Sequence, residues 1–163
     1  MTAEYWDAYD ENLNKIKGIT LVRGEEIPEG LYHLVGEIIV RHTDGTYLLM
    51  QRDPHKHLGL KWELTAGGSA LRGEGGKECA LRELKEECGI SETNPTFLTI
   101  IVSSLNRTIY QLFLCQTDID KDHVSLQQGE TVAYRWISES DLFLMDSKNL
   151  ASIRTRNILK ERK

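Results

Sequence analysis

Residues 68–90 read GSALRGEGGKECALRELKEECGI, a glycine-rich approach followed by a segment with helical periodicity. At 100° per residue, three residues spaced i, i+3 and i+7 share one helix face. They are Leu81, Leu84 and Cys88. Three carboxylates share the roughly opposite face, and these are Glu83, Glu86 and Glu87. Gly89 is the expected C′ residue. The segment therefore predicts a helix within residues 74–90 that packs against a core and presents three carboxylates.

This carboxylate face is locally unfavourable. Like charges at i, i+4 cost roughly 0.2–0.5 kcal/mol. The glutamates also lie in the last turn, where the helix dipole favours cations. A bound divalent cation would reverse both effects, and clustered oxygen ligands suit Mg²⁺ or Mn²⁺ rather than zinc. The alternative interpretation is a solvated acidic face without a ligand.

The spacing resembles the Nudix box, G-x5-E-x7-R-E-U-x-E-E-x-G-U with U aliphatic. The match holds at every specified position: Gly68, Glu74, Arg82, Glu83, Leu84, Glu86, Glu87, Gly89 and Ile90. The resemblance implies membership of the Nudix hydrolase family. It also implies an α/β (α+β) fold, in which an α/β/α sandwich surrounds a mixed sheet.

The resemblance also implies a metal site in the box. Glu83 and Glu87 would be the principal ligands of Mg²⁺ or Mn²⁺. Glu86 would be a further ligand or would help to activate water. Glu74 would support the metal shell, and the backbone carbonyl of Gly68 would join it.

Catalytic roles follow from the same resemblance. Arg82 would orient the carboxylates, and its position favours a charge-assisted pair with Glu74 or Glu86. Glu130 is the candidate general base, because the family often takes this base from a loop before the last strand. Glu86 is the alternative base.

The implied activity is metal-dependent hydrolysis of the diphosphate linkage in a nucleoside diphosphate derivative or a related organic diphosphate. Three residues outside the box are candidate contacts for this small-molecule substrate. Arg52 and Lys61 would bind phosphate. Trp62 would stack on a base, with core packing as its alternative role.

A narrower resemblance links the chain to bacterial Nudix proteins related to isopentenyl-diphosphate isomerase. It rests on the segment EYWDAYDENLNK, on His33 and on WELTAGGSA before the box. That isomerase uses a cysteine directly before its box, where this chain has residues 65–68, TAGG. The missing cysteine favours hydrolysis over isomerisation. A non-catalytic sensor of a nucleotide such as ADP-ribose is the other alternative.

The remaining pattern predicts one domain over residues 1–163, with residues 1–30 as an N-terminal hairpin extension. The expected strands cover residues 4–9, 17–23, 32–41, 47–51, 96–103, 107–116 and 131–137. Ser138 is the expected cap of one C-terminal helix, and residues 147–162 are expected to form another.

Composition excludes several function classes. The net charge is −5 and the pI about 5.6, which disfavours a nucleic-acid polymer as partner. The sequence lacks an apolar run of roughly 20 residues and a signal-peptide core, so no membrane partner is expected and the cytoplasm is the expected location. The three cysteines are expected to be reduced. A homodimer is a further expectation, with the N-terminal hairpin as its contact element.

Overall fold

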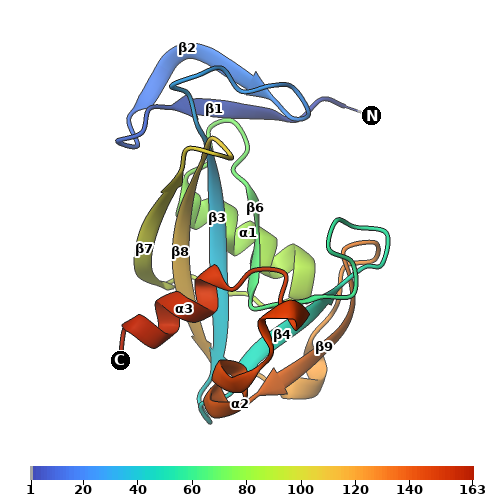
Figure 1. Cartoon of the computed structure of the whole chain (residues 1–163). Helices are drawn as coiled ribbons and strands as arrows, with labels where there is room; N and C mark the ends of the chain where they lie inside the picture. The colour runs from blue at the N-terminus through green and yellow to red at the C-terminus, as the bar shows by residue number, and fades with distance from the viewer. Residues whose placement is uncertain (1) are drawn as a thin grey trace.

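The N-terminal residues form their own hairpin in the computed structural model, which describes residues 2–163. Strands β1 (Tyr5–Tyr9) and β2 (Lys15–Val22) pair antiparallel, as the sequence predicts, although β2 begins earlier than expected. Figure 1 shows this hairpin above the main sheet. Residue 1, with which the predicted extension begins, lies outside the described residues.

The main sheet is organised around β3 (His33–His42). This strand pairs in parallel with β8 (Thr108–Thr117) and antiparallel with β6 (Thr65–Ser69). Strand β7 (Thr96–Ser103) forms a hairpin with β8. Parallel and antiparallel pairs therefore coexist, and the predicted mixed sheet is confirmed.

The strand that follows β3 leaves it almost at once. β4 (Tyr47–Arg52) meets β3 only at the pair Arg41–Tyr47, beyond the predicted turn, where Gly45 has φ +92°. It then pairs with β9 (Thr131–Ile137) and with the two-residue β5 (Trp62–Glu63). Because β4 diverges from β3, the loops around β4 and β9 are free to approach the end of the helix that follows β6.

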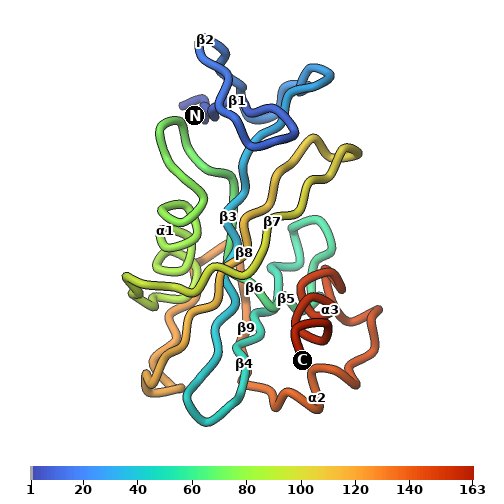
Figure 2. The backbone as a smooth tube through the Cα atoms, turned by 90° about the vertical axis from the view of Figure 1, so that its left-hand side faces the viewer, coloured from blue at the N-terminus to red at the C-terminus, as the bar shows by residue number. Residues whose placement is uncertain are grey.

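Helices cover both faces of the sheet (Figure 2). Helix α1 (Gly76–Cys88) packs its apolar side on Ile38 and Val40 of β3. On the other face, α2 (Glu139–Leu144) and α3 (Arg154–Glu161) contribute Leu142 and Leu159 to a second core cluster. This arrangement is the predicted α/β/α sandwich.

Strand β6 and the last helix are two of the elements that differ from the sequence-based expectation. Strand β6 was not predicted, because glycines and alanine have low strand propensity, yet pairing with β3 holds it extended. The helix expected over residues 147–162 forms only as α3. Before it, a 3-10 turn (η2, Ser147–Asn149) is capped by Asp146, and Leu150 then pairs with Trp62. That pairing interrupts the helix.

Smaller features complete the fold, and the expected Ser138 cap is one of them. Ser138 caps α2 by accepting a hydrogen bond from the backbone N–H of Asp141 at 3.1 Å. A further 3-10 turn (η1) covers Lys121–His123. Cys79, Cys88 and Cys115 are free and buried. None of the helices within residues 2–163 has the length and apolarity needed to cross a membrane.

Candidate active site

Helix α1 begins and ends at glycines. Gly75 is its extended N-cap, and Gly89 ends it in the left-handed region with φ +70°, donating its N–H to the carbonyl of Lys85 at 3.0 Å. Leu84 and Cys88 are fully buried, and Leu81 is partly buried against the same core cluster, as the periodicity predicts. The helix therefore turns its opposite side toward β6 and the loops.

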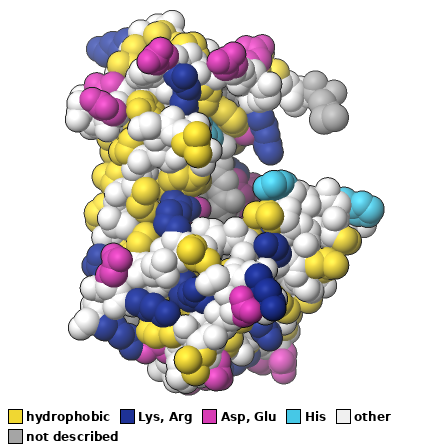
Figure 3. Space-filling model, in the orientation of Figure 1, with side chains coloured by type: hydrophobic (Ala, Val, Ile, Leu, Met, Phe, Trp, Pro, Cys, Tyr) yellow, Lys and Arg dark blue, Asp and Glu magenta, His cyan; other side chains and the backbone are white. Residues whose placement is uncertain are grey.

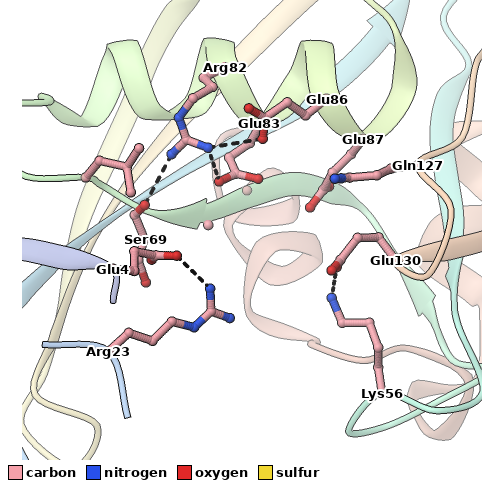
Figure 4. A pocket seen from close by; sticks show the side chains of 13 residues that line it. Glu4, Arg23, Lys56, Ser69, Arg82, Glu83, Glu86, Glu87, Gln127 and Glu130 are labelled. Carbon is pink, nitrogen blue, oxygen red and sulfur yellow. Dashed lines mark hydrogen bonds and ion pairs between the residues drawn. The ribbon is translucent and has the colours of Figure 1, made fainter. Parts of the chain in front are cut away.

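A cavity of about 310 Å³ opens beside this opposite side of the helix. The three box carboxylates all line it, and they are Glu83, Glu86 and Glu87. Figure 3 shows the molecule hollowed below the N-terminal hairpin, and Figure 4 shows the side chains that enter the cavity. A cavity of this size suits a small molecule.

Arg82 holds the carboxylates in place. Its guanidinium donates to both carboxylate oxygens of Glu74, at 2.8 and 3.0 Å, and to Glu83 at 2.7 Å and Glu86 at 3.2 Å. The sequence left Glu74 and Glu86 as alternative partners of Arg82, and the structure has both pairs. Glu74 does not line the cavity, and it acts on the site through Arg82. The hydrogen bond to Glu74, and after it the one to Glu83, raises the pKa of Arg82, so its guanidinium stays charged.

Glu87 is the most buried of the three carboxylates, with 9% of its surface exposed. Burial raises its pKa to about 8, and the negative charges of Glu83 and Glu63 act in the same direction. No ion pair of residues 2–163 includes Glu87. Burial also raises the pKa of Glu83. A cation placed between Glu83 and Glu87 would favour the charged form of both groups.

The missing side chain of Gly68 in β6 leaves room for the Glu83 carboxylate. A Cβ on Gly68 would collide with the Glu83 carboxylate, so glycine is needed for Glu83 to lie against this strand. The carbonyl of Gly68 accepts a hydrogen bond from the thiol of Cys79 at 3.1 Å. This carbonyl and the carboxylates form an all-oxygen donor set, which fits Mg²⁺ or Mn²⁺.

The donor set is open rather than a closed cage. Within residues 2–163, no three His, Cys, Asp or Glu groups converge closely enough to hold a metal by themselves. Mg²⁺ usually keeps several waters and binds through one or two carboxylates plus substrate phosphates. Glu83 and Glu87 would hold the ion, and the rest of its shell would come from water and substrate.

The wall opposite α1 is built by two loops. Glu130, the predicted base, lines the cavity and forms an ion pair with Lys56. The loops are tied together because the N–H of Asp53 donates to the carbonyl of Glu130 at 2.9 Å. The N–H of Gln127 donates to the carbonyl of Glu87 at 3.2 Å, which joins the loop to the helix end.

The three predicted substrate contacts lie elsewhere and do not line the cavity. Arg52 pairs with Glu63 and donates to the carbonyl of His57 at 2.8 Å. Trp62 packs against a core cluster, and the guanidinium of Arg135 lies 4.4 Å from its ring centre. The carbonyl of Lys61 accepts a hydrogen bond from the N–H of Arg52 at 3.0 Å.

Among the lining residues that sequence reasoning did not identify, four have charged or amide side chains. They are Glu4, Arg23, Lys56 and Gln127. Lys56 lies in an irregular segment rich in histidine and lysine, so its charge was a usable signal. The other three follow no motif, and only the tertiary contacts bring them to the site.

Comparison with known proteins agrees with this fold. A family model described as the NUDIX domain matches residues 32–159. An uncharacterized Nudix hydrolase of Listeria monocytogenes is 30% identical over 144 residues, covering 85% of this chain and 82% of the relative.

Two solved structures show the same fold at low identity. One is a crystal structure of a Deinococcus radiodurans protein, with a TM-score of 0.76 and 14% identity over 96% of this chain and 98% of that chain. The other is the NUDIX domain of Shewanella oneidensis NrtR complexed with ADP ribose. It has a TM-score of 0.63 and 15% identity, over 80% of this chain and 88% of that chain.

The narrower resemblance to isopentenyl-diphosphate isomerase finds no support in the family model or in these relatives. The broader assignment rests on a match that runs from before β3 into α3 and includes the whole box. The chain belongs to the Nudix family.

Proposed function

We propose that the protein is a Mg²⁺-dependent pyrophosphohydrolase. Its substrate would contain a diphosphate linkage, as in a nucleoside diphosphate derivative or a related organic diphosphate. The observation that carries this proposal is the convergence of the box carboxylates with Glu130 and Lys56 on one polar cavity. Mn²⁺ is the alternative ion.

The charged residues that α1 and the two loops contribute to the cavity divide the reaction among them. A bound divalent cation would stabilise charge on the phosphoryl oxygens and lower the pKa of water. Glu83 and Glu87 would hold that ion, and Arg82 keeps Glu83 and Glu86 in their orientations. Lys56 binds a phosphoryl oxygen of the substrate, and this contact breaks its ion pair with Glu130.

Released from Lys56, Glu130 accepts the proton of the attacking water. The water oxygen forms a bond to phosphorus while the bridging P–O bond breaks, so the leaving phosphate carries the electron pair of that bond. Glu86 would take the same proton if Glu130 does not.

The cysteines argue against the isomerase alternative. None of the three lines the cavity, and burial raises the thiol pKa of Cys79 and Cys88 to about 12. Thiols with such pKa values are almost entirely protonated at neutral pH, and a thiol is inert in that form. Hydrolysis uses the groups that do face the cavity.

The direct test is phosphate or phosphorylated-product release from a panel of diphosphates, with Mg²⁺ and with EDTA. The panel would contain nucleoside diphosphates and triphosphates, dinucleotide polyphosphates, ADP-ribose, NADH, nucleotide sugars, coenzyme A and isopentenyl diphosphate. We expect Mg²⁺-dependent release from at least one compound. Binding of ADP-ribose in a thermal-shift assay without turnover of any compound would instead support the sensor.

Glu130→Gln tests the general base. We expect kcat to fall by about 10²-fold or more with little change in KM, because proton transfer contributes roughly 10²–10⁴-fold in enzymes. Asp122→Asn is the control, since this exposed carboxylate of the same loop region does not line the cavity. Near-normal kcat in Glu130→Gln, together with a large fall in Glu86→Gln, would assign the base to Glu86.

A further inference from the structure

The N-terminal hairpin contributes a second charged pair to the cavity. Glu4 precedes β1 and Arg23 follows β2, and both line the cavity. They lie outside residues 32–159, the part that the family model matches. In Figure 4, Arg23 and Lys56 enter the cavity from opposite sides, below the carboxylates of α1.

Glu4 is held firmly relative to the sheet. The indole N–H of Trp6 donates to its Oε1 at 2.7 Å. Trp6 is buried and stacks on His33 at the start of β3, with ring centres 4.4 Å apart. The backbone carbonyl of Glu4 also accepts from the N–H of Arg23 at 3.0 Å. The Glu4 carboxylate therefore keeps its place whether or not a ligand is present.

Arg23 is the more exposed partner of this pair. Its Nη1 donates to Oε2 of Glu4 at 3.0 Å, and 67% of its side chain is exposed. An arginine has five N–H donors, so most of those on Arg23 remain available to a ligand. Arg82, by contrast, already donates to Glu74, Glu83 and Glu86.

The lining of the cavity restricts what could bind there. Within residues 2–163, no aromatic side chain lines it, and Leu71 is its one large apolar side chain. The cavity therefore offers no surface on which a nucleobase would stack. It offers two cations on opposite sides, Arg23 and Lys56, each paired with a carboxylate of the cavity wall.

We propose that Arg23 binds a phosphoryl group of the substrate on the hairpin side of the cavity, and that Glu4 competes with this group for the guanidinium. The substrate class is thereby narrowed to compounds with an anionic group on that side of the cleaved linkage. The inference rests on the proposed phosphate chemistry of the cavity. It makes Arg23 and Glu4 determinants of specificity.

If Glu4 competes with the phosphoryl group for Arg23, substitutions of Arg23 and of Glu4 should change the affinity for the ligand in opposite directions. Removing the Arg23 charge removes an attraction for the phosphoryl group. Removing the Glu4 charge frees the guanidinium and removes a repulsion. If the pair only stabilised the hairpin, both changes would break the same ion pair and affect binding in the same direction. The sign of the two effects therefore separates recognition from structural support.

The experiment is calorimetric titration with diimidotriphosphate, a linear triphosphate whose P–N–P bridges resist hydrolysis, in the presence of Mg²⁺. We expect Arg23→Gln to raise Kd on the order of 10-fold, as for the loss of a charge-assisted hydrogen bond. Glu4→Gln, which keeps an acceptor for Trp6, should lower Kd several-fold. Lys17→Gln is the control, because this exposed cation of β2 does not line the cavity.

Three results would overturn the inference: unchanged Kd in Arg23→Gln, a raised Kd in both variants, or no binding of the triphosphate by the unmodified protein. Because binding is measured without turnover, the result is independent of hydrolysis. Hydrolysis of a panel compound with the same KM in Arg23→Gln would reject the Arg23 subsite and keep the hydrolase. Opposite shifts in Kd without any turnover would keep the subsite and reject the hydrolase.

Discussion

Glu87→Gln is expected to lower Mg²⁺-dependent turnover by at least about 100-fold while the protein remains folded. Changes to residues that only support a metal ligand already cost roughly 10–100-fold. Loss of a ligand charge should cost no less. Gln has nearly the same volume as Glu, so the packing of the α1 end against the core should persist. Steady-state kinetics across a Mg²⁺ titration measures the effect.

The pH dependence of stability gives this variant an independent readout. Without metal, the pKa of Glu87 is raised to about 8 in the folded protein, above its ordinary value. The folded state therefore binds a proton that the unfolded state releases, and this destabilises the protein as pH rises from about 4.5 to 8. Glu87→Gln should be at least as stable as the unmodified protein near pH 7, with the difference vanishing toward pH 4.

Mg²⁺ should reverse this order of stability between the unmodified protein and Glu87→Gln. A ligand that binds only the folded protein stabilises it by mass action, so Mg²⁺ should raise the melting temperature of the unmodified protein more than that of Glu87→Gln. Glu78→Gln is the matched control, because Glu78 is exposed on the same helix and does not line the cavity. Unchanged turnover and an unchanged Mg²⁺ response in Glu87→Gln would remove Glu87 from the metal site.

Gly36→Ala is expected to destabilise the protein by about 3 kcal/mol, toward the upper end of what overpacking costs. A Cβ on Gly36 would collide with the carbonyl of Gly76 and would lie 2.7 Å from the backbone nitrogen of Ala80. Both atoms belong to the backbone of α1, so no side-chain rotation relieves the clash. The helix itself must move away from β3.

That movement should also reduce activity, because it displaces Glu83 and Glu87 from the opposite wall of the cavity. A misplacement of about 1 Å can cost on the order of 100-fold in rate. Urea denaturation measures the stability change, and hydrolysis of the panel substrate measures the activity. Val35→Ala is the control, since neighbouring strand residues point to opposite faces and Val35 faces away from α1.

A neutral or stabilising Gly36→Ala would contradict the close approach of α1 to β3. In a site with room for a methyl group, Gly→Ala raises stability by roughly 0.4–1 kcal/mol through the unfolded chain. The sign of the change is thus as informative as its size.

The box shows how much of the site the sequence could predict. Spacing alone indicated that Glu83, Glu86 and Glu87 share a helix face, and the structure places all three on one cavity. The charge pattern also indicated a pair of Arg82 with Glu74 or Glu86, and the structure has both. These are short-range relations within one helix and the turn before it.

The substrate-binding residues were harder to predict. Arg52 and Trp62 precede the box in sequence and have suitable chemistry, yet an ion pair with Glu63 and core packing occupy them. Strand β6 was missed for a related reason, since its glycines extend only because β3 supplies hydrogen-bonding partners. In both cases the competing interaction comes from a segment outside the local pattern.

The sequence by itself determined the helix, its carboxylate face and the family, because an α-helix repeats every 3.6 residues and spacing decides which side chains lie together. Only the tertiary structure decided which residues complete the cavity. Glu4, Arg23, Lys56 and Gln127 meet there because strand pairing and loop contacts join residues far apart in the chain. The free energy of such contacts depends on the whole packed fold, and no local pattern records it.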